Sequence, residues 1–144
     1  MPNIKKYELK KNPTSFEREI ITCSRDSSNF IRRFYQEDIG IYESFFILLL
    51  DQSNATIGYA KISQGGVAGT VVDAAIIAKY AIDSLSRGVV LAHNHPSGNL
   101  TPSVQDREIT AKIKAGLELF DIRVLDHVIL TEENYLSFAD EGLL

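Results

Sequence analysis

Two short apolar runs constrain the fold of this chain more than any other feature. One is "SFFILLLD" over residues 44–51, and the other is "GVVLAHNH" over residues 88–95, which is apolar up to Ala92. Each has the length of a β-strand and is apolar at odd and even positions alike. A strand of this kind must be covered on both faces. We therefore expect two buried strands in a sheet that lies between layers of helices.

The segments around these runs complete an alternating pattern. We predict further strands over residues 56–63, as an antiparallel partner of the first run, and over residues 122–130. Apolar residues at helical spacing predict helices over residues 26–38, 73–86 and 103–120, and "TEENYLSFADEG" predicts a short closing helix. In the third helix, we expect an inward face of Val104, Ile109, Ile113, Leu117 and Phe120. The predicted fold class is a single α/β domain around a mixed sheet flanked by helices.

Two segments carry weak patterns. Residues 1–25 are polar with little periodicity, which predicts an irregular arm. The loop "QGGVAGT" lacks the spacing of a dinucleotide fingerprint and the lysine of a P-loop, so we interpret it as a plain connection. We expect residues 1–42 to form an arm and a short helix within the same domain as residues 43–144.

The composition narrows the class of protein. The lone Cys23 excludes a disulfide framework and a Cys-rich zinc site, and it suits a reducing cytoplasm. The charged N-terminus is not typical of a signal peptide, and the longest apolar run is too short to span a bilayer. A net charge of −4 gives no broad attraction to nucleic acid. We expect a cytoplasmic protein that lies in no membrane and binds nucleic acid weakly or not at all.

The stretch "LAHNHPSGNLTPSVQD" over residues 91–106 gathers several polar groups at the end of a predicted strand. Side chains two residues apart on a strand point the same way, so His93 and His95 can present two imidazoles to one point. Asp106 lies at the start of the next predicted helix, which can fold back over the strand end. Two imidazoles and a carboxylate are a ligand set typical of catalytic zinc.

A second interpretation of the same residues needs no metal. Ser103 and Asp106 fit a capping box, with a serine at the N-cap and an acidic residue three positions later. Polar residues at a strand end are also common on surfaces. The two interpretations are compatible, because one carboxylate oxygen can cap the helix while the other binds a metal.

The spacing of the whole stretch resembles a known signature. His-x-His, seven intervening residues, Ser, two intervening residues and Asp form a pattern similar to the JAMM motif of the JAB/MPN metalloprotease superfamily. The residues "HNHPSGNLTPSVQD", with the later "LDHVIL" and "YLSFADEGLL", resemble its bacterial RadC-like branch. The resemblance runs from about Glu43 to the C-terminus, about two-thirds of the chain.

This resemblance implies a JAB/MPN-type domain with cytidine-deaminase-like layering and a Zn²⁺ site. By the resemblance, His93, His95 and Asp106 are the zinc ligands, and Ser103 helps to hold the oxyanion. The catalytic glutamate of the family lies at the head of an apolar strand, where only Glu43 fits in this sequence. The implied activity is zinc-dependent hydrolysis of a peptide or isopeptide bond in a peptide or protein substrate.

Some features depart from the family pattern or leave alternatives open. RadC-like chains carry Pro-Arg-Glu after the Gly-rich loop, where this chain has "DAA" at residues 73–75, and no helix-hairpin-helix module is expected before Glu43. A non-catalytic JAB/MPN binding module and a RadC-like protein associated with DNA repair or mobile elements remain alternatives. The letters "HNH" do not make an HNH nuclease. We expect His127 to be a strand histidine satisfied by hydrogen bonds, and we assign no function to Cys23.

Overall fold

The computed structural model describes residues 1–66 and 71–144. The two apolar runs form β1 (Ser44–Leu50) and β3 (Gly88–Asn94), which lie side by side in a five-stranded sheet of order β2-β1-β3-β4-β5. β1 pairs antiparallel with both β3 and β2 (Thr56–Gln64). β3 pairs parallel with β4 (Arg123–Leu130), and β5 (Tyr135–Ser137) pairs antiparallel with β4. All residues of β1 and β3 are buried, which confirms the predicted central strands and the mixed sheet.

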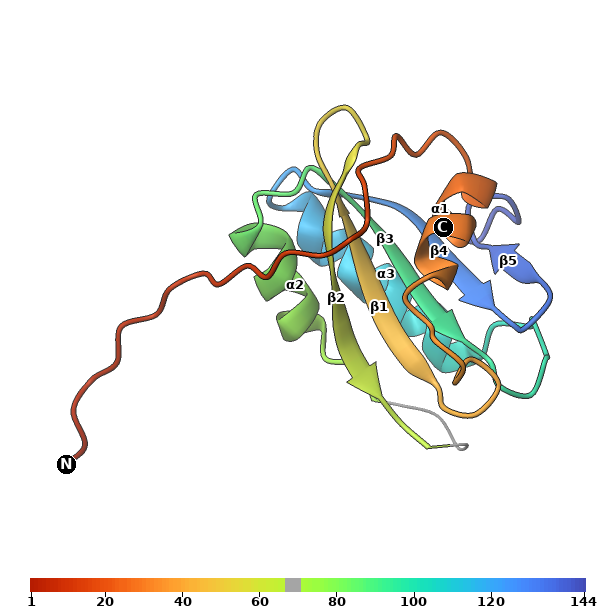
Figure 1. Cartoon of the computed structure of the whole chain (residues 1–144), viewed down its shortest axis with the longest axis horizontal. Helices are drawn as coiled ribbons and strands as arrows, with labels where there is room; N and C mark the ends of the chain where they lie inside the picture. Colours follow the sequence, from red (N-terminus) through yellow and green to blue (C-terminus); the bar gives the residue numbers. More distant parts are fainter. Residues whose placement is uncertain (67–70) are drawn as a thin grey trace.

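Helices cover both faces of this sheet (Figure 1). α1 (Ser24–Arg32) packs on one face, and α2 (Ala74–Asp83) and α3 (Val104–Glu118) pack on the other. Alternate residues of a strand point to opposite faces, so the core has two halves. The α1 side contains Phe46, Leu48, Leu50, Val90, Ala92, Val128 and Leu130, and the other side contains Phe45, Ile47, Leu49, Val89 and Leu91. The chain is therefore a single three-layered α/β domain, as predicted.

The inward face of α3 is shorter than the sequence pattern suggested. Ile113 and Leu117 are buried against the sheet, but Val104 and Phe120 are 67% and 53% exposed. Val104 is the first helical residue, at the rim of the sheet, and Phe120 lies beyond the helix, where the chain turns back toward β4. The prediction that these two residues point inward was wrong.

The predicted closing helix was also wrong, because part of that segment forms β5. The chain reverses after β4 in a tight turn in which Thr131 and Asn134 hydrogen-bond to each other. The buried Asp126 carboxylate then accepts hydrogen bonds from the Ser137 hydroxyl and the Ala139 amide. These contacts tie the segment to the neighbouring strand β4, and this pairing overrides the local helical pattern.

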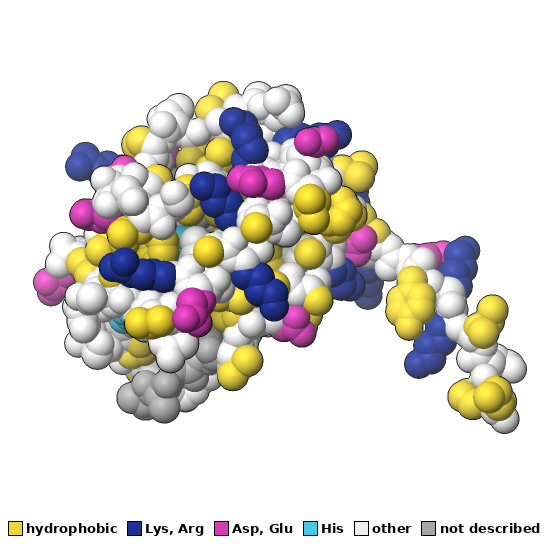
Figure 2. Space-filling view, turned by 180° about the vertical axis from the view of Figure 1, so that it is seen from behind, with side chains coloured by type: hydrophobic (Ala, Val, Ile, Leu, Met, Phe, Trp, Pro, Cys, Tyr) yellow, Lys and Arg dark blue, Asp and Glu magenta, His cyan; other side chains and the backbone are white. Residues whose placement is uncertain are grey.

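The N-terminal segment leaves the body of the domain. Residues 1–15 are exposed and extend away from the body with apolar and basic side chains (Figures 1 and 2). Residue Ile20 then forms a bridge with Ala55. α1 ends at Arg32, six residues earlier than predicted, and the following residues turn toward β1. Most of the Gly-rich loop lies outside the described residues, and within those residues no helix is long and apolar enough to cross a membrane.

Candidate metal centre

Strand pairing brings the two ends of the predicted site together. β1 and β3 are antiparallel, and Phe45 pairs with His93. Continuing this register by two residues places Glu43, just before β1, beside His95, just after β3. All four residues lie on the face of the sheet that α3 covers, since they are two apart on their strands. Glu43 and His95 are far apart in the sequence, but the sheet makes them neighbours.

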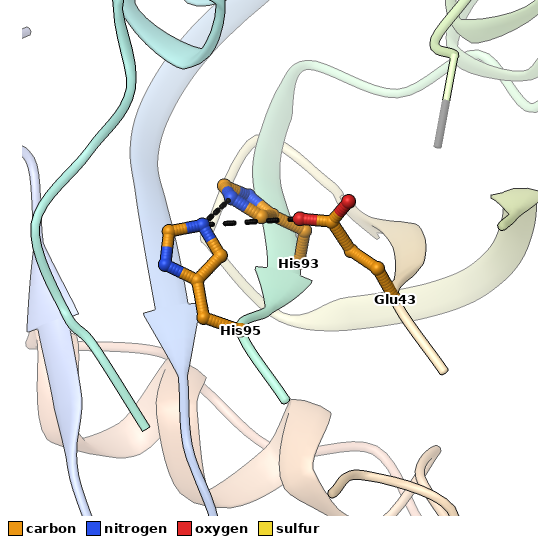
Figure 3. Close-up of side chains that lie close together, drawn as sticks. All are labelled: Glu43, His93 and His95. Carbon is orange, nitrogen blue, oxygen red and sulfur yellow. Dashed lines mark hydrogen bonds and ion pairs between the residues drawn. The ribbon is translucent and has the colours of Figure 1, made fainter. Parts of the chain in front are cut away.

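The rings of His93 and His95 point toward each other and toward the Glu43 carboxylate (Figure 3). The two Nε2 atoms are 2.9 Å apart, and Glu43 Oε1 is 3.8 Å from His95 Nε2. Ligand atoms from these three residues all lie within 4.8 Å of one another. The sequence-predicted pair of imidazoles therefore converges on one point.

The other nitrogen of the His95 ring defines its tautomer. His95 Nδ1 lies 2.6 Å from the backbone carbonyl oxygen of Asn99, which accepts its hydrogen. The Nε2 atom of the neutral ring then carries a lone pair that points at His93. At 2.9 Å, lone pairs on two ring nitrogens repel each other, and a proton or a cation between them relieves this repulsion. This arrangement suits a pair of metal ligands.

Asp106 both caps α3 and approaches the histidines. Its Oδ2 accepts a hydrogen bond from the Ser103 backbone nitrogen at 2.8 Å, and the Ser103 hydroxyl accepts from the Asp106 nitrogen at 3.0 Å. This confirms the predicted capping box. Asp106 Oδ1 also lies 3.3 Å from His93 Nε2, and Oδ2 lies 3.4 Å from His95 Nε2. The capping interaction thus leaves Oδ1 free to face His93.

Without a metal, interactions between the histidines and Asp106 shift the pKa values of His95 and Asp106. Burial favours the neutral form of His95, but the Asp106 carboxylate and the Asn99 carbonyl outweigh it and raise the pKa of His95 above its ordinary value. Burial likewise acts to raise the pKa of Asp106, but hydrogen bonds from His93 and His95, in the form of each ring that carries a hydrogen on Nε2, outweigh it and hold this pKa far below its usual range. The cluster therefore attracts a cation.

Four groups surround this point, so the geometry allows two ligand triads. One contains Glu43 with the two histidines, and the other contains Asp106 with them. Asp106 lies closer to the Nε2 atoms, and its oxygens reach both rings, whereas Glu43 is within 4.0 Å of His95. We give more weight to Asp106 as the third ligand, because its position is fixed by the cap. Glu43 is then the remaining carboxylate beside the same point.

Sequence reasoning missed Asn94, the residue between the two histidines. Its side chain points to the opposite face of the sheet and is fully buried. Asn94 Oδ1 accepts from the Ser44 nitrogen at 2.8 Å, and Nδ2 donates to the carbonyls of Ile39 and Tyr42 at 2.6 and 2.7 Å. These bonds hold the segment that carries Glu43. The sequence contained a signal, since an amide on a strand covered on both faces must find buried partners.

His127 and Thr110 also line the site. His127 on β4 is completely buried, as expected for a hydrogen-bonded strand histidine, and its partners are His93 and the Thr110 hydroxyl of α3. Burial lowers the pKa of His127 well below its ordinary value. Sequence reasoning left the role of His127 open and did not single out Thr110.

A cluster of two imidazoles and two carboxylates at the end of a central strand defines a domain with a candidate metal centre. A sequence model of the family described as the RadC-like JAB domain matches residues 21–143. The chain therefore belongs to the RadC-like JAB domain family. The match begins in the segment before α1, upstream of the part that carries the motif.

Related bacterial proteins share this region. A UPF0758 protein of Flavobacterium johnsoniae is 43% identical over 123 residues, which is 85% of this chain and 53% of that protein. A UPF0758 protein of Porphyromonas gingivalis is 41% identical over 88% of this chain and 56% of its own length. UPF0758 protein YfjY of Escherichia coli is 41% identical over 71% of this chain and 64% of its own length. The chain thus spans about half the length of the first two relatives.

Proposed function

We propose that this protein is a zinc-dependent hydrolase that cleaves a peptide or isopeptide bond in a peptide or protein substrate. The observation that carries the proposal is the convergence of His93 Nε2, His95 Nε2 and the Asp106 carboxylate within 2.9–3.4 Å of one another. Nitrogen and oxygen ligands of tetrahedral zinc, bound at ~2.0–2.2 Å, are spaced by roughly 3.3 Å. The three groups therefore fit this ion.

The residues that would hold zinc are His93, His95 and Asp106. Zinc bound there would lower the pKa of a water molecule toward about 7 and polarise the carbonyl of the scissile bond. Three protein ligands leave a fourth coordination position open, which is typical of catalytic and not structural zinc sites. The lone Cys23 agrees with this, because structural sites are commonly rich in cysteine.

Glu43 would act as the general base and then the general acid. Its carboxylate lies beside His95 and is the group left over when Asp106 completes the ligand set. It would take a proton from the attacking water and deliver it to the nitrogen of the leaving amine. Proton transfer of this kind contributes about 10²–10⁴-fold to the rate.

Ser103 would donate a hydrogen bond to the oxyanion of the substrate. Its hydroxyl accepts from the Asp106 amide in the capping box, so its own hydrogen stays available for a second partner. Ser103 is exposed, which makes it accessible to a bound substrate. One hydroxyl can therefore cap α3 and contribute to oxyanion binding.

Metal analysis with two variants tests the proposal. The purified parent protein, reconstituted with zinc and desalted, should hold one equivalent by elemental analysis, and His95→Ala should hold far less. Glu43→Gln should keep the zinc. Incubated with a peptide library made from digested proteins, the zinc-loaded parent should generate new peptide ends that Glu43→Gln does not generate, as read by mass spectrometry.

Each outcome of these measurements has a distinct meaning. Equal zinc in the parent and His95→Ala would overturn the ligand set, and loss of zinc in Glu43→Gln would place Glu43 among the ligands. Full activity of Glu43→Gln would overturn its proposed role. Ser97→Ala, on the loop after His95, is a control that should match the parent in both assays. A parent that binds zinc and cleaves no member of the library would favour the non-catalytic binding module.

A further inference from the structure

A chain of hydrogen bonds leads from the backbone of α3 to the ring of His93. Thr110 Oγ1 lies 2.6 Å from the Asp106 carbonyl oxygen and 2.6 Å from His127 Nδ1. His127 Nε2 lies 2.7 Å from His93 Nδ1. Thr110, His127 and His93 are all buried, so water does not compete for these bonds. The far end of the chain is His93 Nε2, which faces Asp106 and His95.

The direction of every hydrogen bond in this chain follows from its first member. A backbone carbonyl can only accept a hydrogen bond, so the Thr110 hydroxyl must donate its one hydrogen to the Asp106 carbonyl. The hydroxyl oxygen can then only accept from His127, which places a hydrogen on His127 Nδ1. A positive charge on a completely buried ring would be costly, so His127 is neutral and its Nε2 carries a lone pair.

The lone pair of His127 then defines the state of His93. His93 Nδ1 must donate its hydrogen to His127 Nε2, and the neutral His93 ring is left with a lone pair on Nε2. The opposite direction would put a hydrogen on His93 Nε2, where a metal ligand needs a lone pair. It would also leave two oxygens of Thr110 and Asp106 facing each other at 2.6 Å with no hydrogen between them.

We propose that Thr110 and His127 are positioning residues that fix His93 in its metal-binding tautomer. The proposal rests on the proposed metal site, since it assigns these residues a role toward the ligand His93. Histidine ligands usually donate their second nitrogen to a carboxylate, a carbonyl or water. In this protein, His127 accepts the hydrogen bond from His93. The Asp106 carbonyl of α3 fixes the direction of this bond through the Thr110 hydroxyl. The His127 ring also stacks on Phe138, with 4.6 Å between the ring centroids, and this contact restricts rotation of the imidazole.

Nuclear magnetic resonance of the metal-free parent tests the tautomers directly. Long-range ¹H–¹⁵N spectra of the imidazoles at about pH 8, well above the ordinary histidine pKa, distinguish Nδ1–H from Nε2–H rings. His93 and His127 should both be Nδ1–H tautomers. An Nε2–H tautomer of either residue would overturn the proposal. This measurement needs no variant and no bound metal.

Zinc affinity of two matched Thr110 variants tests the consequence. Thr110→Val keeps the shape but removes the acceptor, so it should bind zinc about 10–100-fold more weakly in competition with a chromophoric chelator. Thr110→Ser keeps the hydroxyl and should bind as the parent does. A folded Thr110→Val with parental affinity would overturn the proposal. If the parent itself binds no zinc, the metal site fails, and the tautomer spectrum still decides this inference separately.

Discussion

The buried side of the site (His93, His127 and Thr110) and its open side (His95, Glu43 and Asp106) are built differently. On the buried side, the His93 side chain is 3% exposed and its ring is held by two further buried side chains. On the open side, the three side chains are 15–17% exposed, and the His95 ring is held by a loop carbonyl. Two histidines that are two residues apart therefore have different supports.

The difference matches two requirements of the proposed catalytic metal site. A ligand works best when its ring is locked by packing and hydrogen bonds, which the buried side provides. A substrate and a water molecule need access, which the open side provides. The same strand serves both requirements, because it ends between the core and the solvent. Substitutions on the two sides should therefore have different effects on folding.

The largest expected effect separates the two histidines. His93→Ala removes a buried ring and leaves His127 Nε2 without its partner, so it should lower the free energy of unfolding of the metal-free protein by roughly 3–5 kcal/mol. His95→Ala should lower it by about 1 kcal/mol or less, because the side chain is near the surface. Both variants should lose zinc. Chemical denaturation measures the first quantity, and equal destabilisation by the two variants would contradict the division of the site.

The next effect concerns Asn94, which holds the Glu43 segment from the other face of the sheet. Asn94→Ala removes three hydrogen bonds and leaves buried backbone groups unpaired, so it should cost roughly 2–4 kcal/mol in unfolding free energy. Zinc should still bind, and hydrolysis should fall because Glu43 is no longer held. Asn99→Ala is the control, since it keeps the backbone carbonyl that binds His95. Parental activity of Asn94→Ala would show that Glu43 does not depend on this clamp.

A smaller effect separates capping from metal binding at the start of α3. Asp106→Glu keeps a residue that suits the capping box, so the metal-free melting temperature should stay near that of the parent. The longer side chain should sharply weaken zinc binding, because it moves the carboxylate away from the short Zn–O distance. Ser103→Ala should cost about 1 kcal/mol as a lost cap, and a larger fractional loss of activity would support its oxyanion role. Parental zinc affinity in Asp106→Glu would leave Asp106 as a cap only.

The smallest expected effect is a pH dependence of the metal-free protein. The pKa of His95 is raised above 6.5 in the folded state, so its contribution to stability is present below pH 6.5 and is lost as the pH rises through the folded-state pKa. The pKa of His127 is lowered in the folded state, so His127 reduces the free energy of unfolding only below about pH 6.5, where its ring is protonated in the unfolded chain. The denaturation midpoint of the parent should therefore fall, relative to that of His95→Ala, as the pH rises above about 6.5. If the denaturation midpoints of the parent and of His95→Ala change with pH in the same way, this prediction is wrong.

The sequence by itself determined the central strands, the capped helix and the polar cluster that follows the second apolar run. These are local features: an apolar run must be buried, and Ser103 and Asp106 cap the helix that begins between them through contacts within four residues. The spacing of His93, His95, Ser103 and Asp106 also indicated the family, which the family match confirmed. The ligand and catalytic roles of these residues remain predictions.

Only the tertiary structure decided which distant groups meet. The register of β1 against β3 placed Glu43 beside His95, and the parallel pairing of β3 with β4 placed His127 under His93. Residues 135–137 form a strand and not a helix, because the Asp126 carboxylate on β4 accepts hydrogen bonds from Ser137 and Ala139. The apolar pattern of the segment does not reveal this pairing. Local sequence determines which faces are apolar, but strand register is a long-range choice, and a shift by one residue would turn each of these side chains to the opposite face of the sheet.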